Sequence, residues 1–264
     1  MIEAALEAVV AAAAAGIVVL LAPRDGWSTE GKGVSFPWTG SVAVAVAAIV
    51  SLWLSEGSAL FALSQRWHSL FASAVVAGVG GLVATVNITP VVFGPFSGPR
   101  TFRPAVLAIT AFIAVALLAF PGHDGSGFRI ACAASAAFGA LILATPSQQH
   151  PRATGFMFAV SLGAMAGILA STGSLKVALA AAALALLCAT TGAIAWASSR
   201  FSQGPAFAMA SLVMLVAFGM YGMAYHDEDG VPVIVWWFVS LSPLVLIAAP
   251  IVHAKMTPSP HVDR

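Results

Sequence analysis

Glu56 is the one acidic residue placed well inside the second apolar segment of this chain. A carboxylate in hydrocarbon is costly, so it usually faces a partner or water and often marks an ion or proton path. A competing interpretation ends the helix near Leu54 and makes residues 55–66 an interfacial or re-entrant piece that Ser55 caps. Glu56 then lies near the membrane surface. A third interpretation is that a bend between Glu56 and Arg66, ten residues on, lets the two pair.

Asn87 and Thr89 form a second polar position, in the apolar stretch GGLVATVNITP. Pro90 removes a backbone donor and crowds the carbonyl group of Val86, four residues back. The carbonyl groups freed by such a break are where a discontinuous helix would hold a cation or a polar solute. The alternative is a proline kink in which Asn87 hydrogen-bonds to a neighbouring helix. Together with Glu56, these two residues are the predicted binding positions.

Two imidazole–carboxylate pairs are predicted to lie on one side of the membrane: His123 with Asp124 in PGHDGSG, and His226 with Asp227 in YHDEDG. Imidazole nitrogen and carboxylate oxygen are suitable ligands for zinc or a related ion, so these four residues are candidate metal ligands. Glycine-rich loops supply little of the fixed geometry that a metal site needs, and no HExxH or paired CxxC spacing strengthens the case. The alternative is a pair of solvated turns.

Small residues follow one helical face at Gly163, Gly167 and Ser171, each four positions after the last. Such a face lacks bulk for two turns, which allows another helix to approach closely. This pattern predicts helix packing and carries no information about a substrate.

Lipid is the solvent that the composition indicates. Of the 264 residues, 60% are hydrophobic, well above the apolar content of about 45–50% in soluble domains. Only 8% are charged. Stretches long enough to cross a bilayer core of roughly 30 Å can satisfy their backbone there only as helices. We therefore predict one all-α transmembrane domain, residues 1–264, with about nine helices and eight as the other possible count. The predicted spans are 2–22, 38–61, 70–93, 104–120, 129–144, 153–170, 175–196, 205–225 and 233–253.

The basic residues set the predicted orientation. With nine spans, eight of them fall on one side and three on the other, and the richer side is expected to be cytoplasmic. The amino terminus is then outside, the carboxyl terminus is cytoplasmic, and the membrane is a cell membrane of the cytoplasmic type. The eight are Arg24, Lys32, Arg100, Arg103, Arg152, Arg200, Lys255 and Arg264, and the three are Arg66, Arg129 and Lys176.

The functional expectation is transport of a small solute or ion through a polar site between helices. A non-catalytic membrane subunit or assembly factor is the main alternative, and a lipid-modifying enzyme is a third. Catalysis is disfavoured because the chain has no nucleophile, prenyl-transfer or nucleotide-hydrolysis motif, and no cofactor is expected. Lipid, other membrane subunits or a second copy are the expected partners, whereas nucleic acid is not, since no basic run could follow a phosphate backbone.

Overall fold

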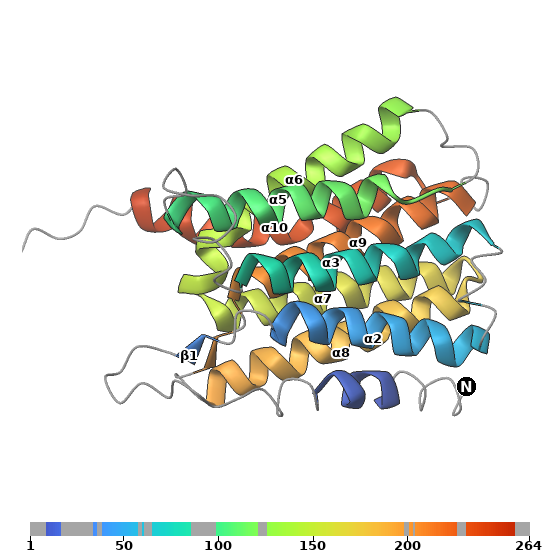
Figure 1. Cartoon of the computed structure of the whole chain (residues 1–264), viewed down its shortest axis with the longest axis horizontal. Coiled ribbons are helices and arrows are strands. Elements are labelled where there is room, and N and C mark those ends of the chain that lie inside the picture. Colours follow the sequence, from blue (N-terminus) through green and yellow to red (C-terminus); the bar gives the residue numbers. More distant parts are fainter. Residues whose placement is uncertain are drawn as a thin grey trace, which may run out of the picture.

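Helices account for most of the chain in the computed structural model, which describes residues 9–16, 34–35, 39–57, 60, 65–85, 99–120, 126–197, 201–202, 204–225 and 231–256. Residues 9–16 are helical, and a short 3₁₀ helix, η2 (Arg66–His68), precedes α3. Two-residue strands β1 (Val34–Ser35) and β2 (Phe201–Ser202) pair in parallel. The long helices are α2 (Thr39–Glu56), α3 (Ser69–Thr85), α5 (Pro99–Ala116), α6 (Ser126–Gln149), α7 (Pro151–Ser171), α8 (Leu175–Ala197), α9 (Gly204–Tyr225) and α10 (Val233–Met256) (Figure 1).

Helix length and composition together define a multi-pass membrane protein. Within the described residues, five helices are long and apolar enough to cross a bilayer: Thr39–Glu56, Gly127–Ser147, Pro151–Ser171, Leu175–Ala197 and Gly204–Tyr225. Three shorter apolar helices, Ser69–Ala84, Pro104–Ala116 and Val233–Val245, accompany them. The predicted helical membrane fold is therefore confirmed, while the count of nine spans and the orientation stay predictions.

The second predicted span is shorter than the apolar segment suggested. α2 ends at Glu56, and Gly57 follows with a φ of 62°, the left-handed conformation that commonly terminates a helix. The continuous helix over 38–61 was thus wrong, and the alternative of a stop near Leu54 is close to what is observed. Ser55 does not cap a following helix, because its hydroxyl group donates to the carbonyl oxygen of Ser51 within α2 at 3.0 Å.

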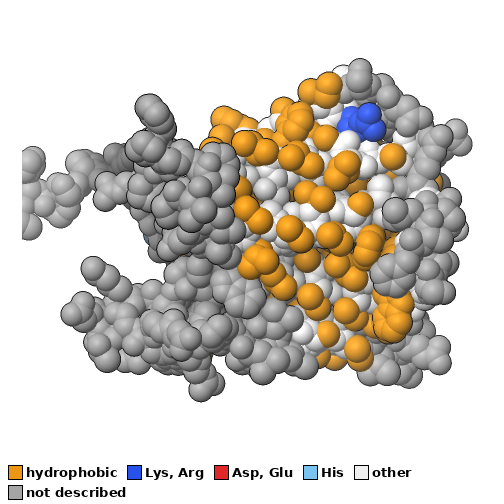
Figure 2. Space-filling view, in the orientation of Figure 1, with side chains coloured by type: hydrophobic (Ala, Val, Ile, Leu, Met, Phe, Trp, Pro, Cys, Tyr) orange, Lys and Arg blue, Asp and Glu red, His pale blue; other side chains and the backbone are white. Residues whose placement is uncertain are grey.

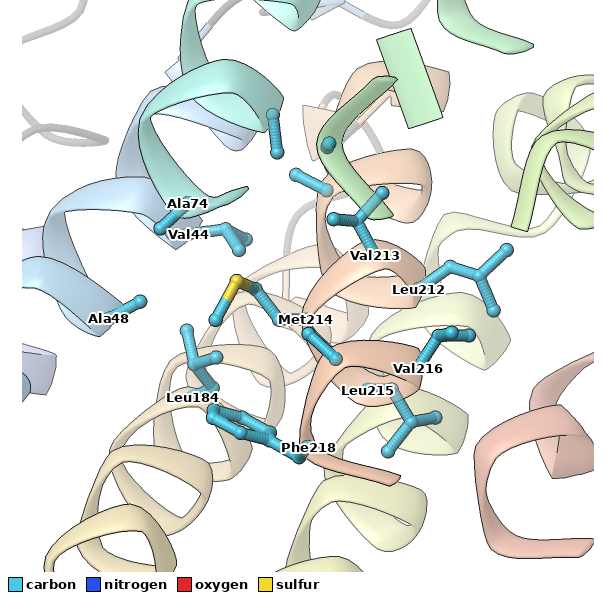
Figure 3. Packing of buried hydrophobic residues seen from close by; sticks show 14 of the residues in the cluster. Val44, Ala48, Ala74, Leu184, Leu212, Val213, Met214, Leu215, Val216 and Phe218 are labelled. Carbon is cyan, nitrogen blue, oxygen red and sulfur yellow. The ribbon is translucent and has the colours of Figure 1, made fainter. Parts of the chain in front are cut away.

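α9 fills the middle of the bundle. It has no polar face, and most of its side chains are buried, as expected for a helix that is apolar all round. All the other long helices contact it, α6 and α3 most extensively. Figure 3 shows Met214 of α9 beside Val44 of α2, Ala74 of α3 and Leu184 of α8. With α9 at the centre, the other helices have one face toward protein and one toward the surroundings.

The helix ends gather at two opposite ends of the bundle. At one of them, α2, α7 and α9 end and α3, α8 and α10 begin (the right-hand side of Figure 1); we call this the Glu56 end. The backbone N–H of Ala119, just after α5, donates there to Ser69 Oγ at 3.3 Å, and Phe128 of α6 meets Trp237 of α10 edge to face. The β1–β2 pair lies at the opposite end, before α2 and α9 begin.

Glycine allows several helix pairs to approach closely, among them α2–α3 and α7–α8. A Cβ atom added at Gly78 of α3 would lie 2.6 Å from the Cβ of Ala45 in α2. One added at Gly192 of α8 would lie 3.2 Å from the backbone nitrogen of Phe156 and 3.4 Å from the carbonyl carbon of Gly155, both in α7. These contacts hold the α2–α3 and α7–α8 pairs together through van der Waals packing, the main source of helix association in lipid.

The predicted packing face of Gly163, Gly167 and Ser171 contacts no other described helix, so its role in packing stays a prediction. All three residues are exposed on α7, and a Cβ added at either glycine meets no described atom within 4 Å. The hydroxyl group of Ser171 donates to the carbonyl oxygen of Ile168 in its own helix at 2.7 Å. No described helix of this chain packs on the face, because α8 lies against the side of α7 that carries Gly155.

The outer surface is apolar across the middle of the bundle. Hydrophobic side chains cover the described part of the face in Figure 2, where basic atoms form a single patch near one end and no acidic atom is visible. Val160, Ile234 and Phe238 are 66%, 71% and 72% exposed. Single exposed apolar side chains are common on soluble proteins, but a surface that exposes so many of them suits lipid.

Candidate functional site

A partly open cleft of about 470 Å³ lies at the Glu56 end. Pockets for small molecules range from about 300 to 1,000 Å³, so a small solute fits. The lining comes from the end of α2, the segment before α3, the α7–α8 turn and the last part of α9. The lining residues are Glu56, Gln65, Trp67, Gly173, Ser174, Leu175, Lys176, Val177 and Tyr221.

An ion pair crosses one wall of this cleft. Lys176 Nζ donates to Glu56 Oε1. The two side chains differ in burial, because that of Glu56 is 12% exposed and that of Lys176 is 58% exposed. Lys176 therefore supplies most of the compensation for the shielded carboxylate charge, while the lysine side chain is also open to the surroundings.

Each charge of the pair lies at the unfavourable end of its own helix. Glu56 is the last residue of α2, where the helix dipole is negative, and Lys176 is the second residue of α8, where it is positive. Neither charge stabilises its own helix, so the pairing between α2 and α8 is what compensates both. The pair links two helices whose charged residues are 120 positions apart.

The α7–α8 turn positions the second wall. Gly173 has a φ of 87°, a conformation that L side chains rarely adopt, and it lets the chain reverse within three residues. The N–H of Ser174 donates to the carbonyl oxygen of Leu169 at 3.0 Å, and the Ser174 carbonyl accepts the first bond of α8, from Ala178, at 2.9 Å. The Ser174 hydroxyl group hydrogen-bonds to that of Tyr221 at 3.0 Å, which ties the turn to α9.

Aromatic rings complete the cleft. Tyr221 stacks on Tyr225, with centroids 4.7 Å apart, and meets Phe120 edge to face at 6.0 Å. On the opposite side, Trp67 Nε1 donates to Gln65 Oε1. Trp67 and Tyr221 thus offer aromatic surface beside an ion pair, in a cleft that also contains amide and hydroxyl groups.

His68 packs against Trp67 and Gln65, two of the residues that line the cleft. It is fully buried, and its Nδ1 accepts from the backbone N–H of Gln65 at 3.5 Å. The Trp67 ring meets the imidazole edge to face, with centroids 4.5 Å apart. His68 Nε2 has no hydrogen-bond partner among the described residues. The imidazole therefore holds the segment between α2 and α3 in place through Nδ1 and its ring.

The predicted site residues have different outcomes. Glu56 lines the cleft, and its partner is Lys176; the side chain of Arg66 lies outside the described atoms. Asn87, Thr89, His123, Asp124, His226 and Asp227 all lie outside the described residues, so the predictions made for them remain untested. Within the described part of the chain, no group of three or more His, Cys, Asp or Glu side chains could hold a metal ion.

Sequence reasoning did not connect Lys176, Ser174 and Tyr221 to Glu56. It did place Lys176 on the same side of the membrane as the end of α2, which was the available signal. The two free thiols, Cys132 and Cys188, are fully buried in helices and lie outside the cleft.

The chain matches no protein-family model, and comparison with characterised proteins and solved structures finds no significant similarity. The cleft and the bundle that carries it are therefore the basis of the functional proposal.

Proposed function

We propose that this membrane protein moves a small polar solute or ion, and that the solute first binds in the cleft at the Glu56 end. The observation that carries the proposal is the Glu56–Lys176 pair lining a cleft of about 470 Å³. Charged residues make up only 8% of the chain, and these two occupy unfavourable helix ends. Local helix stability does not explain such a placement, and two opposite charges that line one cleft can form charge-assisted hydrogen bonds with a solute.

The position of Glu56 gives it a specific part in this proposal. A carboxylate at the last residue of α2 acts at the mouth of the bundle, not at the middle of the membrane. α3 begins directly after η2, beside the cleft, and ends at Thr85, next to the predicted break at Asn87 and Thr89. We place a second solute position at that break. With the orientation that the basic residues predict, the Glu56 end faces outward, in a cell membrane of the cytoplasmic type.

A flux measurement on the purified protein in liposomes tests the proposal. Solutes are supplied in classes: amino acids, sugars, organic acids, amines and monovalent cations. Uptake of labelled solute, together with current on a solid-supported membrane, detects both neutral and charged movement. At least one class should move faster than through protein-free liposomes, and no class doing so would contradict the proposal.

Two matched tryptophan variants locate the path. Leu175 lines the cleft and is 56% exposed, so Leu175→Trp should narrow the cleft and reduce flux several-fold. Leu186 lies farther along α8, away from the cleft, and is 44% exposed, so Leu186→Trp adds the same bulk without touching the cleft and should leave flux unchanged. Equal flux through both variants would show that the cleft is not on the path.

A second candidate function is that of a non-catalytic subunit, and the exposed face of Gly163, Gly167 and Ser171 favours it. Close helix approach is possible there, yet no described helix of this chain uses it. Under this candidate, Gly163→Leu with Gly167→Leu should reduce the oligomeric mass of the protein in mild detergent. Ala134→Leu, at an exposed position of α6, is the control. An unchanged mass with both glycines replaced would remove the candidate in its homo-oligomeric form.

A further inference from the structure

We infer that the cleft at the Glu56 end recognises a small zwitterion, a molecule that carries one ammonium group and one carboxylate. This inference deepens the proposed function, since it names the class of solute that the same cleft takes. It rests on the difference in burial between the two charges, on the groups beside each of them, and on the size of the cleft.

The burial of the pair disfavours a simple anion. An anion would have to draw Lys176 away from Glu56, whose side chain is only 12% exposed. That leaves a shielded carboxylate with no partner, and a shielded charge without a partner is strongly destabilising. Binding one anion at the expense of the pair therefore gains little.

A simple cation is also a poor match. It would replace the ammonium group of Lys176 on Glu56 with another ammonium group, so the number of ion pairs stays the same. Lys176 is 58% exposed and tolerates release into the surroundings. The exchange supplies no net electrostatic gain, and the added positive charge repels the released side chain.

A zwitterion inserted between the two residues converts one ion pair into two. Its ammonium group pairs with Glu56 while its carboxylate pairs with Lys176, so no charge is left without a partner. Charge-assisted hydrogen bonds of this kind are the stronger ones in proteins. Lys176 can move to admit the ligand because more than half of its side chain is exposed.

The groups beside each charge match this orientation. Lys176 and Val177 lie in the first turn of α8, where backbone N–H groups lack acceptors within the helix and the dipole favours an anion. The N–H of Leu175, the first residue, already donates to the carbonyl oxygen of Gly173 at 3.0 Å. Aromatic surface from Trp67 and Tyr221 lines the same cleft, and aromatic faces attract ammonium groups. The cleft thus offers a carboxylate partners at the start of α8, and it offers an ammonium group both Glu56 and aromatic surface.

A binding measurement with matched ligands tests the inference. The ligands are the unbranched ω-amino acids from two to six carbons, each with the amine and the carboxylic acid of the same chain length. Calorimetry on the purified full chain in detergent, at constant ionic strength, gives the affinities. At least one amino acid should bind at least tenfold more tightly than its matched amine and its matched acid. Equal binding by the amine or by the acid would overturn the inference, as would no binding by any amino acid.

Three variants localise the binding. Glu56→Gln and Lys176→Met each remove one charge of the pair, and each should weaken amino acid binding at least tenfold. Arg129→Gln removes a basic charge near the start of α6, at the same end of the bundle but outside the cleft, and should leave binding unchanged. Tight amino acid binding that survives Glu56→Gln would also overturn the inference.

The binding and flux experiments distinguish failure of the zwitterion inference from failure of the transport proposal. Flux of a sugar or a metal cation without binding of any amino acid contradicts the zwitterion and leaves transport in place. Amino acid binding at Glu56 without flux of any solute supports the zwitterion and contradicts transport.

Discussion

Replacing Gly78 with alanine should force α2 and α3 apart. The added Cβ would lie 2.6 Å from the Cβ of Ala45, whereas two carbon atoms in contact are best separated by about 3.5–4.0 Å. The helices must therefore separate by roughly 1 Å. Since the backbone of α3 carries the new atom directly, a change of side-chain rotamer cannot relieve the overlap.

The expected net effect of Gly78→Ala is a loss of up to about 2 kcal/mol of stability. Overpacking of this kind costs about 1–3 kcal/mol, and the better helix propensity of alanine offsets about 1 kcal/mol of it. At about 2–4 °C per kcal/mol for a chain of this size, the midpoint of thermal unfolding falls by up to roughly 8 °C. Unfolding of the detergent-solubilised protein, followed by far-ultraviolet circular dichroism, measures the change.

Gly163→Ala is the matched control, because it makes the same substitution inside a helix at a place where the new Cβ meets no described atom within 4 Å. It should gain the propensity term alone, up to about 1 kcal/mol. The difference between the two glycine variants therefore isolates the packing of α2 on α3.

Exchanging the two side chains provides a second check. Ala45→Gly removes the Cβ atom that the new Cβ of Gly78→Ala would overlap. In the double variant, as in the natural protein, only one of the two positions carries a methyl group. Its stability should exceed that of Gly78→Ala alone, a non-additive result typical of residues in contact. If Gly78→Ala unfolds at the same temperature as Gly163→Ala, or if Ala45→Gly gives no rescue, this account of the α2–α3 contact is wrong.

Three further outcomes are expected. Lys176→Met should destabilise the protein more than Glu56→Gln does, because Lys176→Met leaves the shielded carboxylate of Glu56 without its partner. Glu56→Gln leaves only the exposed lysine without its partner, which should cost less than about 1 kcal/mol. Ser161→Ala and Ser242→Ala should each cost about 0.5–1.5 kcal/mol, and the double variant less than their sum, since their hydroxyl groups are 2.7 Å apart across α7 and α10. In intact cells, Leu175→Cys should react with a membrane-impermeant maleimide, and protection until the cells are opened would reverse the predicted orientation.

The helices were predictable because lipid imposes one requirement on every span. A backbone in hydrocarbon must satisfy its own polar groups, so apolar length alone identifies the helices. α7 and α8 begin and end within a few residues of their predicted spans. α2 was predicted too long because apolar residues continue beyond Glu56, and hydropathy does not register a glycine in the left-handed conformation.

The packing of the helices was less predictable, as the small residues show. The spacing of Gly163 and Gly167 resembles that of a packing face, yet other glycines make the close contacts within the described bundle. They are Gly78, Gly80, Gly81, Gly139, Gly192, Gly219 and Gly222. Small residues permit close approach, but the identity of the helix that approaches depends on which helices become neighbours. That arrangement arises from the burial of α9 and not from any local pattern.

The cleft was predictable only in part for the same reason. Glu56 is conspicuous in the sequence because a carboxylate is rare in an apolar segment. Lys176 is not conspicuous, since a lysine at a helix end has many ordinary roles. Their meeting depends on the contact of α2 with α8, which brings together residues 120 positions apart. Periodicity and composition contain no information about such a contact.

Several buried polar groups lie toward the Glu56 end of the bundle. Among the described residues, the side-chain atoms that are buried without a hydrogen-bond partner belong to Ser51, His68, Ser73 and Trp236. Each lies near the Glu56 end of its element: Ser51 is five residues before Glu56, and the other three stand at or near the starts of α3 and α10. None of these four residues lines the cleft. The Glu56–Lys176 pair and the groups beside it are therefore the features that favour binding at this end of the bundle.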